Sequence, residues 1–224
     1  MEEIKRVERS KKQAKISYDK LSKWYDFLAG GSEKKYRDAG LVKLSVKQGE
    51  KVLEVGFGTG YCISLLARSV GEDGKVYGLD ISEGMLSMTA SRLKKSGLNE
   101  RTELQCGDAA NLPYSENLFD AIFISFTLEL FDTPDIPIVL REFRRVLKNS
   151  GRICVVSMSK EGKTGLMIKL YDWAHEIFPN YVDCRPIYVR QALENANFEI
   201  ADATKMSLSG LPIEIILAKK NCKC

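Results

Sequence analysis

The 224-residue sequence has a single histidine and no run of apolar residues long enough to cross a bilayer. Charged residues occur throughout its N-terminus, which has no apolar segment of the secretory type, so we expect a cytoplasmic protein. The net charge is only +4 at pH 7, and no arginine-rich stripe is interleaved with aromatic residues. A nucleic-acid partner is therefore not expected.

The spacing of the cysteines does not indicate a set of disulfides. The six cysteines are scattered, and three of them fall in predicted buried elements, which favours reduced thiols over disulfides. Cys222 and Cys224 form one CxC pair without further ligands, so no metal site is predicted. The length and the 44% hydrophobic content are typical of one α/β domain with a sizeable core.

The most informative stretch is KVLEVGFGTGY, at residues 51–61. Its apolar, β-branched first half predicts a buried strand, and the spacing of the apolar residues after it predicts an amphipathic helix. Three glycines stand at alternate positions between the two elements: Gly56, Gly58 and Gly60. Glycine permits positive φ and a close approach of the backbone to a ligand, which the free amides of the first helical turn then face. The pattern is typical of a nucleotide-binding βα unit.

The glycine spacing narrows the kind of nucleotide. The dinucleotide fingerprint GxGxxG is missing, because Tyr61 and Ile63 stand where its third glycine would have to be. A phosphate-binding P-loop also fails, since no Lys followed by Ser or Thr comes after these glycines. The pattern that remains is ExGxGxG, with Glu54 two residues before the first glycine. An NAD-dependent oxidoreductase stays open as an alternative.

A second acidic residue follows the next predicted strand. Residues 75–82, KVYGLDIS, predict a strand that ends at Asp80. An acid at the tip of the second strand can accept hydrogen bonds from both hydroxyls of a ribose. An aspartate after a strand is also a common helix N-cap or turn residue, and that alternative remains open.

These motifs, together with NLPYSENLFDAIFISF at residues 111–126, resemble the class I S-adenosylmethionine-dependent methyltransferases. Within that family the sequence is most similar to the small single-domain members related to the ubiquinone and menaquinone methyltransferases. The resemblance implies an α/β, Rossmann-like, seven-stranded sheet in the order 3-2-1-4-5-7-6, with strand 7 antiparallel and helices on both faces. It also implies S-adenosylmethionine as the cofactor.

The resemblance further implies which residues hold the cofactor. In the family, an acid at the position of Asp108 accepts a hydrogen bond from the adenine amine, and the amide of the next residue, Ala109, faces the ring. Met85 matches a hydrophobic residue that lies against adenine, and Ser125 one that borders the methionine part. Alternatively, Asp108 is only a turn residue and Met85 only fills the core. The full predicted set is Tyr18, Tyr25, Glu54, Gly56, Gly58, Gly60, Asp80, Ile81, Met85, Asp108, Ala109 and Ser125.

Residues 1–45 are expected to form an N-terminal helical lid. They contain YDKLSKWYDFLAGG, in which two Tyr-Asp pairs stand seven residues apart. In methyltransferases of the quinone type a tyrosine of this segment closes over the cofactor, which favours Tyr25 and then Tyr18. The alternative is that the aromatic residues pack this helix end onto the core. The lysines of the segment form either a solvated face or a peripheral contact with anionic lipid.

Residues 46–220 are predicted to form the S-adenosylmethionine-binding domain, with residues 159–186 as an insertion that builds the acceptor pocket. The aromatic residues of this insertion suit a flat, greasy molecule. The sequence therefore favours methyl transfer to a small hydrophobic or aromatic, quinone-like acceptor. The alternatives are a phospholipid amine, a small metabolite, or a binding module without catalysis. The oligomeric state is not indicated.

Methyl transfer is an in-line displacement that needs alignment of the reactants and exclusion of water, and no protein nucleophile. A base is needed only when the acceptor loses a proton. The candidates are His175, because histidine titrates near neutral pH, and Glu129, which follows the fourth predicted strand. Alternatively, His175 is structural or exposed, and Glu129 is a first-turn helix acid favoured by the helix dipole. No catalytic residue follows from the sequence alone.

Overall fold

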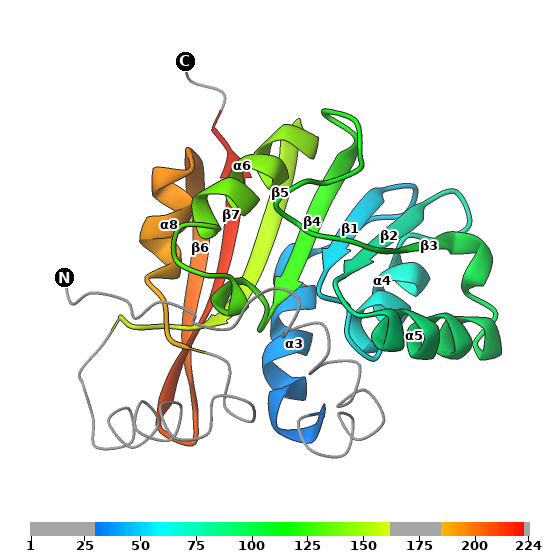
Figure 1. The fold of residues 1–224 in the computed structure, drawn as a ribbon, viewed down its shortest axis with the longest axis horizontal. Coiled ribbons are helices and arrows are strands. Elements are labelled where there is room, and N and C mark those ends of the chain that lie inside the picture. The colour runs from blue at the N-terminus through cyan, green and yellow to red at the C-terminus, as the bar shows by residue number, and fades with distance from the viewer. Residues whose placement is uncertain (1–29, 162–184, 222–224) are drawn as a thin grey trace.

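The computed structural model describes residues 30–161 and 185–221, which form a seven-stranded sheet with helices on both faces (Figure 1). The sheet order is β3-β2-β1-β4-β5-β7-β6. β1 pairs in parallel with β2 and β4, whereas β7 runs antiparallel to both β5 and β6. The predicted order and the antiparallel seventh strand are confirmed. The strands are β1 Lys51–Val55, β2 Lys75–Asp80, β3 Thr102–Cys106, β4 Phe119–Ser125, β5 Leu147–Met158, β6 Phe198–Leu208 and β7 Leu211–Lys220.

The helices divide between the two faces of the sheet, and each face has its own buried core. α6 and α8 cover one face through Val139, Phe143 and Leu193, while α3, α4 and α5 cover the other with residues such as Tyr36 and Ile63. The central strands are thus buried on both sides, as their continuous apolar sequences require. The helices are α3 Gly30–Leu44, α4 Tyr61–Ser69, α5 Glu83–Lys95, α6 Ile136–Val146 and α8 Val189–Asn195, with short 3-10 turns η1 Asn99–Arg101 and η2 Leu128–Leu130.

The boundary between α6 and β5 differs from the prediction. The sequence pattern predicts a helix over 133–148 and a strand from Arg152, but α6 ends at Val146 and β5 already begins at Leu147. The reason is tertiary, because Leu147 pairs with Phe119 of β4 before the regular pairing starts. The local residues that end a helix do not show which distant strand will pair with the residues that follow.

The β-type runs at 199–206 and 213–218 predict a hairpin at the edge of the sheet. The hairpin is present, and its strands are longer than these runs. β6 and β7 extend until Leu208 pairs with Leu211, which leaves Ser209 and Gly210 as a two-residue turn. Both turn residues have positive φ, 49° and 89°. This backbone geometry matches the right-handed twist of the two strands that it joins.

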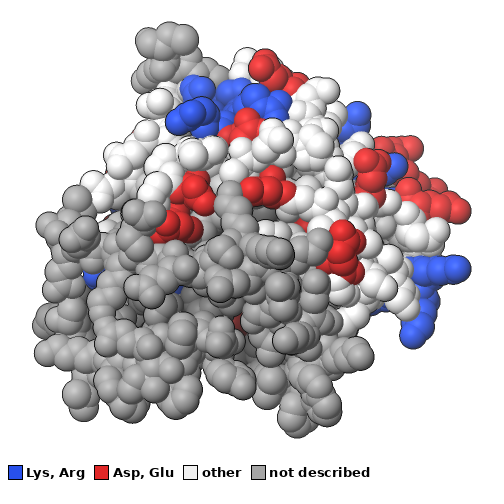
Figure 2. Space-filling model, in the orientation of Figure 1, with Lys and Arg blue, Asp and Glu red and all other residues white. Residues whose placement is uncertain are grey.

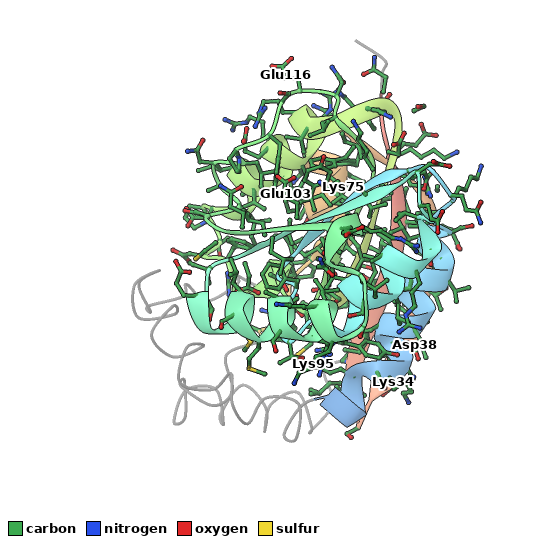
Figure 3. All side chains as sticks on the ribbon, turned by 90° about the vertical axis from the view of Figure 1, so that its right-hand side faces the viewer. Lys34, Asp38, Lys75, Lys95, Glu103 and Glu116 are labelled. Carbon is green, nitrogen blue, oxygen red and sulfur yellow. The ribbon has the colours of Figure 1, made fainter. Side chains whose placement is uncertain are left out.

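Residues outside the two cores contribute less to the fold. Lys34 and Asp38 pair along α3 at 2.6 Å, and Lys75 pairs with Glu103 of the neighbouring strand at 3.5 Å (Figure 3). Such exposed pairs typically add less than about 1 kcal/mol. Within the described ranges, no helix is both long and apolar enough to span a membrane. The three described cysteines, Cys62, Cys106 and Cys154, take part in no disulfide.

α3 is the element that ties the N-terminal part of the chain to the sheet. Its Gly40 packs so closely that a Cβ there would lie 2.5 Å from Cγ2 of Val156 on β5. Arg152 of β5 holds the C-terminal end of the helix, since Nε donates to the Leu44 carbonyl at 2.6 Å and the guanidinium also forms a bidentate pair with Glu50. Bidentate pairs of this kind fix orientation as well as position.

We predict that Gly40→Ala destabilises the protein, although alanine is the better helix former. Helix propensity alone favours alanine by about 1 kcal/mol, whereas overpacking against a buried β-branched side chain costs about 1–3 kcal/mol. The expected net result is a lower Tm, measured by thermal unfolding. Val42→Ala is the control, because Val42 lies on the same helix and is 79% exposed. A higher Tm for Gly40→Ala would show that α3 does not dock as described.

Candidate functional site

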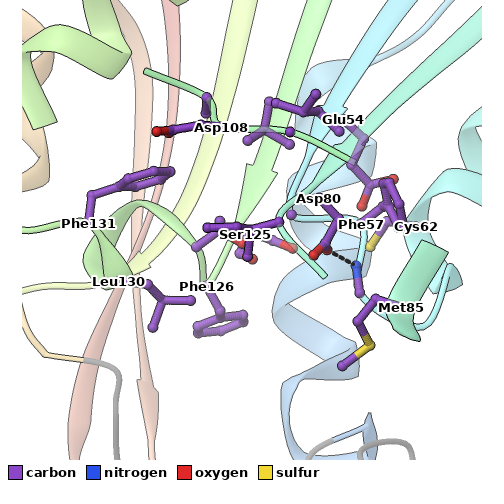
Figure 4. Close-up of a pocket in the computed structure, with 18 of the residues that line it drawn as sticks. Glu54, Phe57, Cys62, Asp80, Met85, Asp108, Ser125, Phe126, Leu130 and Phe131 are labelled. Carbon is purple, nitrogen blue, oxygen red and sulfur yellow. Dashed lines mark hydrogen bonds between the residues drawn. The ribbon is translucent and has the colours of Figure 1, made fainter. Parts of the chain in front are cut away.

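The carboxyl ends of β1, β2 and β4 open into a cleft whose empty space, including its mouth, is about 1250 Å³ (Figure 4). The glycine turn after β1, the loop after β3 and the segment after β4 form its walls. The carboxyl edge of a parallel sheet is where open α/β folds place their ligands. Nine predicted site residues line this cleft: Glu54, Gly56, Gly58, Asp80, Ile81, Met85, Asp108, Ala109 and Ser125.

The glycine turn has the backbone geometry that its spacing predicts. Gly56, Gly58 and Gly60 all have positive φ, at 74°, 51° and 85°. A Cβ on Gly56 would collide with the side chain of Thr127, and one on Gly60 would lie 2.7 Å from that of Thr89. Among the described residues, nothing lies within 4 Å of the Cβ position of Gly58, so this glycine leaves open space on the cleft. Gly60 instead leads the chain into α4.

Asp80 ends β2 and is held in place by two backbone amides. Its Oδ2 accepts from the Gly58 amide at 2.9 Å, and its Oδ1 accepts from the Ser82 amide at 3.0 Å (Figure 4). The N-cap of α5 is Ser82, whose side chain accepts from the Met85 amide at 3.1 Å. The alternative that Asp80 serves as the helix N-cap is therefore wrong. Its carboxylate is positioned at the floor of the cleft.

The opposite wall comes from the loop after β3. Oδ1 of Asp108 accepts from the Ala110 amide at 3.0 Å, which fixes the side chain in a tight turn. Ala109 is buried beside it, and Met85 faces the cleft from α5. Ser125, at the end of β4, lies between the two walls (Figure 4).

Arg37 of α3 also lines the cleft, and the sequence reasoning missed it. It pairs with Glu33, and its guanidinium carbon lies 6.0 Å from the centre of the Phe126 ring. In the sequence, Glu33 and Arg37 look like an ordinary surface ion pair one helical turn apart. Only the docking of α3 on the sheet brings Arg37 to the site, so no local signal could have identified it.

Acidic side chains outnumber cationic ones among the described residues that line the cleft. Among its described lining residues, Arg37 is the only one with a cationic side chain, whereas five are acidic: Glu54, Asp80, Asp108, Asp132 and Asp135. In Figure 2 several acidic side chains lie across the middle of the face shown, and a group of Lys and Arg side chains lies near its upper edge. A site of this composition favours a ligand that carries net positive charge.

Glu54 is the most deeply placed of these acids. Its side chain is almost fully buried, and burial raises its pKa well above the usual range, with Arg37 acting in the opposite direction. Beyond β4, Phe126, Leu130 and Phe131 form an apolar wall (Figure 4). The cleft therefore has a polar half at the glycine turn and an apolar half next to η2.

Glu129 of η2 is fully buried and does not line the cleft. Burial raises its pKa to about 8, against hydrogen bonds from its own backbone amide and that of Met158, which lower it. Glu129 lies in the first turn of the short helix η2, as the alternative holds, and there it is buried. Tyr18, Tyr25 and His175 lie outside the described residues, as do residues 162–184 of the predicted insertion.

Comparison with known proteins places the chain in a family. It matches the ubiE/COQ5 methyltransferase family over residues 3–183. It is 30% identical over 223 residues to a demethylmenaquinone methyltransferase of Lactobacillus johnsonii. This alignment covers 91% of this chain and 88% of the relative. The demethylmenaquinone methyltransferase of Bacillus subtilis is 33% identical over 166 residues, with 72% and 70% covered.

Solved structures show the same fold at lower identity. The [4+2]-cyclase SpnF superposes with a TM-score of 0.80 at 20% identity, over 97% of this chain and 98% of its own. A SAM-dependent methyltransferase from Aquifex aeolicus gives a TM-score of 0.63 at 24% identity, over 92% and 97%. These likenesses establish the architecture, and the family match establishes the activity class, which rules out the NAD-dependent alternative. The chain belongs to the ubiE/COQ5 methyltransferase family and is an S-adenosylmethionine-dependent methyltransferase.

Proposed function

We propose that the protein transfers the methyl group of S-adenosylmethionine to a quinone-like aromatic acceptor. The observation that carries this proposal is the apolar wall of Phe126, Leu130 and Phe131, which adjoins the polar half of the same cleft. A flat ring can pack against that wall while the donor occupies the glycine turn. The relatives named as demethylmenaquinone methyltransferases support the same acceptor class.

The charge of the described residues suits the donor. S-adenosylmethionine carries a sulfonium, an ammonium and a carboxylate, so its net charge is positive and suits the acidic lining. Asp80 would accept from the ribose hydroxyls, since its carboxylate is already oriented by two amides. Asp108 and Ala109 would hold the adenine, with Met85 against its ring. The open space at Gly58 lets the backbone approach the nucleoside.

Arg37 and Glu54 would hold the methionine part of the donor. Arg37 is the one cation among the described lining residues, so it is the group that can pair with the donor carboxylate. Glu54 lies deeper and would face the ammonium. With both ends of the donor fixed, Ser125 at the end of β4 would border the methionine part of the donor, which carries the sulfonium.

Bound S-adenosylmethionine supplies a methyl group on a positively charged sulfur. The task of the protein is to align the acceptor atom with that methyl carbon at about 3 Å and to exclude water. Packing of the acceptor ring against the apolar wall would both align the ring and exclude water. A quinone with an isoprenoid tail is held in a membrane, so the proposal implies a peripheral contact with lipid from the cytoplasmic side. Residues 1–45 and 159–186 remain our proposed lid and acceptor insertion.

We predict that Asp80→Asn lowers the affinity for S-adenosylmethionine about tenfold or more, because the ribose loses a charged acceptor worth about 1.5–3 kcal/mol. Isothermal titration calorimetry of the purified variant measures the change. Glu103→Gln is the control, since Glu103 is an exposed acid on the neighbouring strand β3. Unchanged affinity in a folded Asp80→Asn protein would remove the ribose assignment.

We predict that Arg37→Met removes the preference for a donor with a carboxylate. The wild type should bind S-adenosylmethionine about tenfold more tightly than its decarboxylated analogue, and the variant should bind the two about equally, because the charged hydrogen bond is lost. Competition binding with both compounds measures this difference. A preference that survives in Arg37→Met would place the carboxylate elsewhere.

The acceptor proposal is tested with a labelled methyl donor and three acceptors: reduced demethylmenaquinone with a short side chain, phosphatidylethanolamine, and a soluble catechol. We predict transfer to the first. Phe131→Ala should raise the KM for this acceptor about tenfold while leaving donor affinity unchanged, since a stacking surface is lost. Transfer to the phospholipid alone would contradict the proposal.

A further inference from the structure

Arg185 is a buried arginine whose guanidinium bonds the chain segment that contributes to the apolar wall. The residue is only 5% exposed, and it does not itself line the cleft. Its Nη1 donates to the Thr133 hydroxyl at 2.9 Å, and its Nη2 donates to the Phe131 carbonyl at 2.5 Å. These two acceptors lie on either side of Asp132 in the sequence. One guanidinium therefore fixes two points of the segment between η2 and α6.

The segment that Arg185 bonds belongs to the acceptor half of the cleft. Phe131 and Asp132 both line the cleft, and the Phe131 ring points into it (Figure 4). Phe131 directly follows η2 and has an extended backbone, with φ −72° and ψ 143°. It belongs to no helix or strand, so no regular ladder of backbone hydrogen bonds sets its orientation. The bond from Arg185 to its carbonyl supplies that constraint.

Arg185 is in turn anchored to the end of the sheet. Two residues further on, Ile187 is buried and forms a parallel bridge with Ser159, which directly follows β5. The Ile187 amide donates to the Met158 carbonyl at 3.2 Å, and the Ile187 carbonyl accepts from the Lys160 amide at 3.0 Å. The guanidinium thus connects chain that is fixed next to β5 with the segment after β4, which is 52 to 54 positions away in the sequence.

The residue type suits positioning better than packing. A guanidinium is planar, stays charged and presents its N–H groups in a fixed fork, whereas a lysine ammonium is a point charge on a flexible chain. A buried charge opposes folding unless it is paired and hydrogen-bonded, so an apolar side chain would fill the same space more favourably. What the arginine adds is a fixed direction for two hydrogen bonds.

We propose that Arg185 is a positioning residue for the acceptor, because it fixes the Phe131 backbone and keeps the ring where an aromatic acceptor packs against it. This inference rests on the proposed function. Arg185 touches neither reactant, and it acts through Phe131. Methyl transfer depends on alignment, and a displacement of about 1 Å can lower a rate about 100-fold. The contacts proposed for the donor come from other segments, so donor binding should not depend on Arg185.

The test replaces Arg185 by lysine, which keeps the positive charge and loses the fork. With reduced demethylmenaquinone as acceptor, Arg185→Lys should raise the acceptor KM about tenfold, while donor affinity by calorimetry stays within twofold of wild type. A purely structural role would lower the Tm and the amount of folded enzyme, and would leave the KM of the folded enzyme unchanged.

Arg144→Lys is the matched control. Arg144 also donates to a backbone carbonyl of a distant segment, that of Asn221 at 2.8 Å, and it does not line the cleft. This variant should keep the wild-type KM for the acceptor.

A double-mutant cycle shows whether Arg185 acts through Phe131. In the Arg185→Lys background, Phe131→Ala should raise the acceptor KM by less than threefold, because the ring is already displaced. Independent effects would instead multiply to about 100-fold. Thr133→Val removes one acceptor of the guanidinium and keeps a β-branched side chain, so it should raise the KM about threefold. It leaves Arg185 in place and gives the answer even if Arg185→Lys does not fold.

Three results would overturn the role of Arg185 and leave the proposed function intact. They are an acceptor KM within twofold of wild type in the folded forms of Arg185→Lys and Thr133→Val, multiplying effects in the double mutant, and weakened donor binding in Arg185→Lys. If the wild type binds the donor but transfers no label to the reduced quinone, the proposed function itself is wrong and this assignment falls with it.

Discussion

The hydrogen bond from the Gly58 amide to the Asp80 carboxylate is the contact on which the donor half of the site depends. β1 and β2 are parallel and in register, so that Val55 pairs with Leu79 and the two strands end side by side. The positive φ of Gly58 turns its amide toward Asp80 at 2.9 Å. The side chain of Thr127 then packs against Gly56, which connects the same turn to the segment after β4. The ends of β1 and β2 and the segment after β4 are thus all positioned around the glycine turn.

The contact proposed for the donor carboxylate depends on long-range packing. α3 reaches the sheet because Gly40 permits close contact with β5 and because Arg152 holds the end of the helix. This docking brings Arg37 to a cleft that is otherwise lined by acids within the described residues. The amino-acid end of the donor would therefore meet Arg37 from α3 and Glu54 from β1. Since the same fold supports many chemistries, these contacts and not the architecture define the reaction.

Three buried acids lie near the carboxyl edge of the sheet: Glu54, Glu129 and Glu214. Burial raises the pKa of each, and each has an oxygen without a hydrogen-bond partner among the described residues. Desolvation of this kind opposes folding. Of the three, only Glu54 lines the cleft, so it is the one whose missing partner a bound donor would supply.

The sequence by itself determined the features that depend on neighbouring residues. The alternating glycines predicted the positive-φ turn, the apolar runs predicted the buried strands, and the position of Asp80 at a strand end predicted its place in the cleft. Family resemblance added the order of the sheet. Tertiary structure alone decided the start of β5 at Leu147, the arrival of Arg37 and the burial of Glu129. Sequence spacing encodes the local backbone, but burial and charge environment arise from contacts between distant residues, such as Arg152 and Glu50, which are 102 positions apart.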